Sequence, residues 1–211
     1  AEDGIRDYKV TGVQTCALPI FACNTATTNA ISYLRKHYSV PFIGIEPATK
    51  PAILNTKSGV IGILATKGTL ASELFYNTSQ KHRGDVEIIE QVGTGLVQLI
   101  EQNKIEETKI LLEKYLSPMI EKGADNIVLG CSHYPFLKPI IISLIPDNIQ
   151  IIDSGAPVAK QTKSILLKNN LQSYQDDSPA LSFYTNGEIE VLDSFIKNFN
   201  LNKAYTSFET F

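Results

Sequence analysis

Two cysteines stand where an apolar run gives way to a helix-like segment. Cys23 lies in the run Phe-Ala-Cys-Asn-Thr-Ala-Thr, and Cys131 lies in Val-Leu-Gly-Cys-Ser-His-Tyr-Pro. In an open α/β sheet, ligands bind beyond the carboxyl ends of the strands, where helix starts direct backbone N–H groups outward. The same N–H groups stabilise thiolates. We therefore expect both thiols to face a ligand and to ionise more readily than free cysteine.

Simpler interpretations of these residues remain open. A buried cysteine is usually an inert, small apolar side chain, and His133 may equally be a hydrogen-bonded core histidine. Asn24 and Thr25 are suitable as helix caps as well as for ligand contact. Cys131 with His133 would supply half of a zinc site, but the chain has no matching second Cys/His pair. A Cys–His protease pair lacks a recognisable orienting residue.

The elements that must position the cysteines alternate between strand and helix patterns, which predicts an α/β fold with a parallel sheet. Short Val/Ile/Leu-rich runs predict strands, and segments with helical periodicity lie between them. The expected strands lie near 41–45, 59–65, 86–91, 126–129, 149–152 and 181–184. The clearest expected helices are 26–37, 68–79, 105–122, 156–169 and 188–198.

Composition excludes several other classes of protein. The 211 residues are 43% hydrophobic and carry a formal charge of −3, with no basic patch that would indicate nucleic-acid binding. No apolar run reaches the ~20 residues that a membrane helix needs. Three cysteines without a C-x-x-C pair argue against a disulfide framework. We expect a globular protein of the cytoplasm.

Several longer motifs, taken in order, resemble the glutamate racemase family. They are A-C-N-T-A-T, V-P-F-I-G-I-E-P-A-T-K-P-A, I-G-I-L-A-T-K-G-T, V-L-G-C-S-H-Y-P-F-L-K-P and I-I-D-S-G-A. The resemblance implies two similar open parallel-sheet α/β domains that face each other across a cleft. Residues 21–57 and 151–211 would form the first domain, which is expected to be incomplete, and residues 58–150 would form the second.

The resemblance also implies a reaction. Cys23 and Cys131 match the two family cysteines that remove the α-proton of glutamate on one face and return a proton on the other. By the family pattern, Cys23 acts on D-glutamate and Cys131 on L-glutamate, without cofactor or metal, and the D-glutamate serves peptidoglycan synthesis. The substrate-binding positions match Asn24, Thr25, Thr66, Ser132 and His133. His133 would also assist Cys131.

The start of the chain departs from the family pattern. Residues 1–20 read like a translated sequencing adapter. The family's D-S-G-x-G-G segment and Y-G pair are absent ahead of Cys23, and Asp153-Ser154-Gly155 matches a later family position. We therefore expect a fragment with little or no activity. Alternatives are an aspartate racemase of the same superfamily and a non-catalytic module that binds an acidic ligand. Pairing as a homodimer stays open.

Overall fold

The computed structural model describes residues 18–172, 181–197, 199, 201 and 204–210. The expected adapter-derived leader comprises residues 1–20. Its residues 1–17 lie outside the described residues, and residues 18–20 lie within them. Its last residue, Ile20, already belongs to a strand, because β1 (Ile20–Phe21) pairs in parallel with β2 (Ile43–Gly44).

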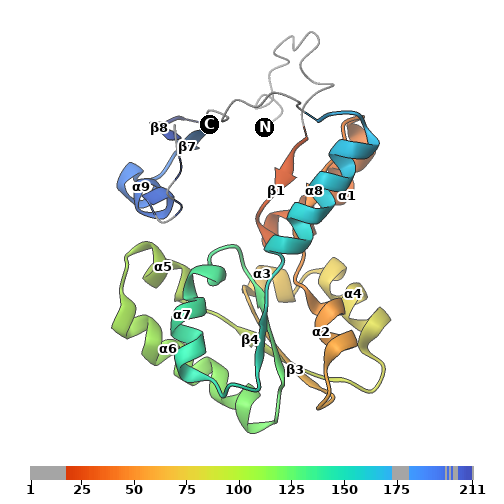
Figure 1. Cartoon of the computed structure of the whole chain (residues 1–211), viewed down its shortest axis with the longest axis vertical. Coiled ribbons are helices and arrows are strands. Elements are labelled where there is room, and N and C mark those ends of the chain that lie inside the picture. Colours follow the sequence, from red (N-terminus) through yellow and green to blue (C-terminus); the bar gives the residue numbers. More distant parts are fainter. Residues whose placement is uncertain (1–17, 173–180, 198, 200, 202–203, 211) are drawn as a thin grey trace.

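A four-stranded parallel sheet forms the centre of the molecule (Figure 1). Its order is β4-β3-β5-β6, and its members are β3 (Val60–Ala65), β4 (Glu87–Val92), β5 (Asn126–Gly130) and β6 (Gln150–Ile152). The two central strands, β3 and β5, are almost wholly buried, as expected when helices cover both faces. The predicted α/β class with parallel strands is confirmed.

Helices cover both faces of this sheet (Figure 1). One face carries α5 (Leu96–Glu101), α6 (Ile105–Glu121), the 3-10 turn η1 (Tyr134–Leu137) and α7 (Lys138–Leu144). The other carries α2 (Thr49–Asn55) and α4 (Glu73–Arg83). Along α6, Leu112, Leu116 and Met119 are fully buried, whereas Ile105 is exposed.

The prediction of a single helix over 68–79 is wrong, because the chain forms two helices there, α3 (Lys67–Leu70) and then α4. Ser72 interrupts the helix. Its hydroxyl donates to the Thr69 carbonyl oxygen over 2.7 Å and accepts from the Phe75 N–H over 3.3 Å. A serine that binds backbone on both sides ends one helix and caps the next.

The remaining elements form two groups, each with one pair of parallel strands. The first group contains β1, β2, α1 (Asn24–His37) and α8 (Gly155–Lys168). The other consists of β7 (Leu181–Thr185), α9 (Ile189–Lys197) and β8 (Ala204–Phe208). β6 straddles the expected domain boundary between residues 150 and 151. Because it pairs with β5, all three of its residues belong to the four-stranded sheet.

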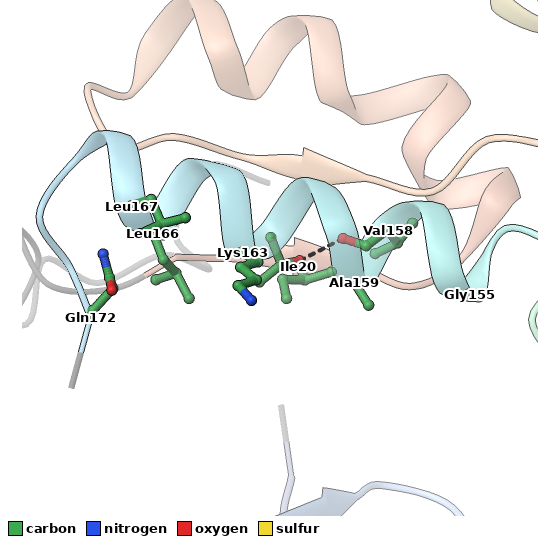
Figure 2. Close-up of a pocket in the computed structure, with 9 residues that line it drawn as sticks. Ile20, Gly155, Val158, Ala159, Lys163, Leu166, Leu167 and Gln172 are labelled. Carbon is green, nitrogen blue, oxygen red and sulfur yellow. Dashed lines mark hydrogen bonds between the residues drawn. The ribbon is translucent and has the colours of Figure 1, made fainter. Parts of the chain in front are cut away.

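An apolar groove of about 660 Å³ runs along α8 beside β1 (Figure 2). Ile20, Val158, Leu166 and Leu167 contribute most of its apolar surface. None of the predicted site residues lines it.

Asp125, just before β5, binds the turn between α2 and β3 by hydrogen bonds. Its carboxylate accepts hydrogen bonds from the Thr56 hydroxyl (2.7 Å), the Lys57 N–H (2.6 Å) and the Ser58 N–H (2.8 Å). Burial alone would raise the pKa of Asp125, but these bonds together lower it to about 2.

We predict that Asp125→Ala lowers the free energy of unfolding at pH 7 by about 1–2 kcal/mol, because three donors lose their acceptor. Since the folded pKa lies below the unfolded value of ~3.9, the contribution of the carboxylate is full above pH ~4 and is lost as the pH falls towards 2. Urea unfolding at pH 7 and pH 3 measures both effects. Asp147→Ala, at an exposed position, is the control; equal losses in both variants at pH 7 would contradict the assignment.

Candidate active site

The register of the central strands places the first site residues side by side. Ala65 of β3 pairs with Gly130 of β5, so Thr66 and Cys131 are the next residues at the carboxyl edge of neighbouring parallel strands. Ligands bind at this edge in open α/β sheets. The expected position of Cys131 at a ligand-facing strand end agrees with this arrangement.

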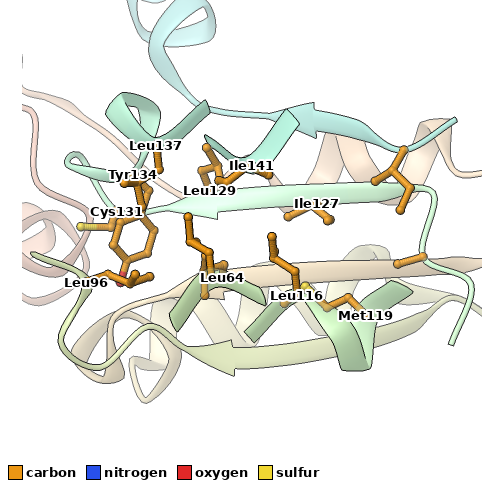
Figure 3. Packing of buried hydrophobic residues seen from close by; sticks show 13 residues of the cluster. Leu64, Leu96, Leu116, Met119, Ile127, Leu129, Cys131, Tyr134, Leu137 and Ile141 are labelled. Atoms are coloured by element: carbon orange, nitrogen blue, oxygen red, sulfur yellow. The ribbon is translucent and has the colours of Figure 1, made fainter. Parts of the chain in front are cut away.

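Cys131 lies at one end of the buried core of the four-stranded sheet, and its sulfur points away from that core (Figure 3). The residue is 8% exposed. Burial raises the pKa of the Cys131 thiol; the backbone N–H of His133 lowers it, a charge on Cys23 raises it further, and the net shift is upward. The expectation that this thiol ionises more readily than free cysteine is therefore wrong for Cys131, because the cost of desolvation exceeds the stabilisation by N–H groups.

Cys23 occupies the N-cap of α1, so Asn24 and Thr25, which the sequence offered as caps, lie in the first turn of the helix instead. Its sulfur accepts from the Ala26 N–H over 3.5 Å, and its carbonyl oxygen accepts from the Thr27 N–H over 2.9 Å. The Cys23 side chain is exposed, unlike that of Cys131. A negative charge on Cys23 would act on the Cys131 thiol and raise its pKa.

Asn24 follows Cys23 and is 2% exposed, yet its Oδ1 atom has no hydrogen-bond partner. A buried polar atom without a partner costs about 1–3 kcal/mol. It is therefore a ready acceptor for a ligand that carries a donor, such as an ammonium group.

Thr25 and Thr66, both predicted to bind substrate, lie in contact with each other. Their hydroxyl oxygens are 2.8 Å apart, and the Thr69 hydroxyl lies 3.1 Å from the first and 3.0 Å from the second. Thr25 comes from the start of α1, whereas Thr66 caps α3 after β3. The contact thus joins the segment that carries Cys23 to the strand beside Cys131.

Ser132 and His133 take different roles around Cys131. The Ser132 side chain and the His133 backbone N–H both act on the thiol and lower its pKa. The His133 imidazole binds elsewhere: its Nε2 atom lies 3.0 Å from Glu101 Oε1, and its ring meets the Phe195 ring edge-on at 5.9 Å between centroids. His133 therefore contacts the thiol through its backbone and Glu101 through its side chain.

Sequence reasoning did not single out Glu101, Phe195 or the hydroxyl of Thr69 as site residues. Glu101 ends α5 and Phe195 lies in α9, both far from the cysteine motifs along the chain. Thr69 carried one local signal, since it follows Thr66 by three residues, the distance over which a capping hydroxyl reaches an N–H.

Two features are absent from the part of the chain that the structure describes. No group of three His, Cys, Asp or Glu side chains is arranged to hold a metal ion there. Among the described helices, none has both the length and the apolarity to cross a membrane.

Known proteins share both the sequence and the fold. The family model for Asp/Glu/Hydantoin racemase matches residues 10–162. The glutamate racemase of Herpetosiphon aurantiacus is 42% identical over 173 residues, which cover 81% of this chain and 68% of that protein. The glutamate racemase of Ectopseudomonas mendocina is 41% identical over 180 residues, covering 84% and 68%. The chain thus spans about two thirds of the length of these relatives.

Solved structures support the same fold. A glutamate racemase isoform from Bacillus anthracis superposes with a TM-score of 0.79 at 23% identity, covering 92% of this chain and 73% of that one. The Escherichia coli glutamate racemase in complex with L-glutamate and the activator UDP-MurNAc-ala gives a TM-score of 0.75 at 26% identity, covering 90% and 73%. On the extent of these matches, the chain belongs to the Asp/Glu/hydantoin racemase family.

Proposed function

We propose that this protein interconverts L-glutamate and D-glutamate by a two-thiol mechanism. The observation that carries the proposal is the Thr25–Thr66 contact, which joins the segment with Cys23 to the end of β3, the strand beside the one that Cys131 follows. A charge on Cys23 also raises the pKa of the Cys131 thiol. The identity of 42% to a curated glutamate racemase supports glutamate as the substrate.

The chemistry needs one proton acceptor and one proton donor on opposite faces of the α-carbon. Two nearby thiols disfavour each other's negative charge, so when one is a thiolate the other keeps its proton, which is the state the reaction requires. We assign Cys23 to proton removal from D-glutamate and Cys131 to proton removal from L-glutamate. Each cysteine returns the proton when the other has removed it.

The polar groups around the thiols match the charges of an amino acid. Hydroxyls of Thr25, Thr66 and Ser132 can donate to carboxylate oxygens, and the unpartnered Asn24 Oδ1 can accept from the ammonium group. The His133 backbone N–H acts on the Cys131 thiol, while its imidazole is held by Glu101 at 3.0 Å. Fixed donors of this kind stabilise charge that develops on the substrate as the proton leaves.

The proposal extends to the protein's setting in the cell. D-glutamate would supply peptidoglycan synthesis, as the family resemblance implies. The free thiols Cys23 and Cys131 favour a reducing compartment such as the cytoplasm. Pairing of two copies as a homodimer is tested by light scattering of the purified chain.

We predict that L-glutamate incubated with the protein in D2O acquires deuterium at the α-carbon as it converts to D-glutamate. A two-thiol mechanism takes the new proton from the second thiol, so early in the reaction deuterium appears in the product and not in the remaining substrate. Incubations of hours allow slow turnover to be detected. Chiral chromatography separates L-glutamate from D-glutamate, and proton NMR measures the deuterium at the α-carbon of each.

The variants Cys23→Ser and Cys131→Ser should each lower the rate at least ~100-fold, in keeping with the usual effect of a general acid or base. Lys57→Ser, at an exposed position away from the thiols, is the control. Glutamate binding without any deuterium uptake would instead indicate the binding module, and faster exchange on aspartate would indicate an aspartate racemase.

We also predict that alkylation of Cys131 by iodoacetamide reaches its half-maximal rate at a pH above the ordinary thiol range, because burial raises its pKa. In Cys23→Ser the charge of the first thiolate is gone, so the Cys131 profile should move to lower pH. Peptide mass spectrometry resolves the two sites. A Cys131 profile that is identical in the two proteins would show that the thiols do not sense each other.

A further inference from the structure

Thr69 has a burial and a bonding pattern that distinguish it from the two threonines it contacts. Its side chain is 0% exposed, whereas Thr25 and Thr66 are half-buried. Its hydroxyl lies within hydrogen-bond distance of both, at 3.1 Å and 3.0 Å. Its backbone N–H also donates to the Thr66 hydroxyl oxygen over 3.2 Å.

The number of hydroxyl protons limits the hydrogen bonds that these three threonines can make. Each threonine hydroxyl has one proton to donate and an oxygen that can accept. If the three hydroxyls donate in a closed ring, all three protons are used and none is left for a ligand. Thr69 has no solvent-facing surface, so its proton must stay within the cluster. Its N–H serves the Thr66 oxygen and its O–H can serve the Thr25 oxygen. One more proton lies between the Thr25 and Thr66 oxygens, which are 2.8 Å apart, so one hydroxyl proton of this pair is left for a ligand.

We propose that Thr69 is a positioning residue that holds Thr25 and Thr66 so that one hydroxyl proton of this pair points at a carboxylate of the substrate. This inference rests on the proposed function, since it deepens the description of the same site. Thr69 touches no substrate itself. An O–H group whose oxygen already accepts a hydrogen bond is a stronger donor, so the inward bonds from Thr69 strengthen the outward bond.

The surroundings hold Thr69 in this place. Gly68 lets the backbone of α3 approach α1, because a Cβ atom at that position would lie 2.8 Å from Thr25 Cγ2. On the other side, the buried Ser72 hydroxyl donates to the Thr69 carbonyl oxygen over 2.7 Å. Thr69 therefore cannot shift towards solvent without breaking contacts on both sides.

The test compares Thr69→Val, which keeps shape and N–H but removes the hydroxyl, with Thr69→Ser, which keeps the hydroxyl. The probe is L-glutamate, and its apparent dissociation constant is read from protection of Cys23 against iodoacetamide. Thr69→Val should bind about 5- to 10-fold more weakly, the usual effect of losing one hydrogen bond, and Thr69→Ser should stay within about twofold of the wild type. Thr108→Val removes another buried hydroxyl, one that bonds the Lys104 carbonyl, and should leave binding unchanged.

Two results overturn the proposal: wild-type affinity in Thr69→Val, or an equal loss in Thr69→Val and Thr69→Ser, which would mean that packing and not the hydroxyl matters. Circular dichroism checks folding, and Thr69→Ala replaces a valine variant that does not fold.

Should L-glutamate fail to protect the wild type, the proposed function fails, and Thr69 is judged without ligand. Amide exchange in the first turn of α1 is then compared by mass spectrometry. Faster exchange in Thr69→Val alone supports the hydroxyl link between Thr69 and Thr25, whereas equal exchange in Thr69→Val and the wild type overturns it.

Discussion

The close pairing of β3 with β5 at their carboxyl ends is the constraint on which the site depends. A Cβ atom on Gly130 would lie 2.7 Å from the Ala65 Cβ and 3.3 Å from Pro47 Cγ. Any side chain at that position would push the strands apart and move Cys131 away from Thr66. The glycine before the cysteine is therefore required by packing, and it sets where the thiol meets the rest of the site.

The two thiols have different surroundings, and this difference follows from the fold. Cys131 ends a buried central strand, so desolvation dominates its pKa. Cys23 begins an exposed helix and bonds the Ala26 N–H. In the proposed reaction both groups exchange roles, so bound substrate would remove water from Cys23 and supply polar partners near Cys131. Beside Cys23, the buried Asn24 Oδ1 has no hydrogen-bond partner among the described residues.

Sequence patterns predicted the parts of the site that are local in the chain. Continuous apolar runs marked β3 and β5, and Cys131 was picked out because it follows one of them. Thr66 was named only through the family resemblance. Contacts between segments that are far apart in the chain leave no such pattern in the sequence. The contact of Glu101 with His133, for example, is a single pair of side chains. The break at Ser72 was also missed, because serine is compatible with a helix interior and ends one only through the bonds it makes in three dimensions.

The contacts that build the site also join the units of the fold. Thr25 on α1 bonds Thr66 at the end of β3, and Phe195 on α9 packs against His133 after β5. In both pairs the first residue lies in a segment expected to form the first domain and the second in the four-stranded unit. A ligand held by residues from both units would strengthen their attachment by mass action, because it binds only when both are in place. Substrate binding and attachment of the units would thus be coupled.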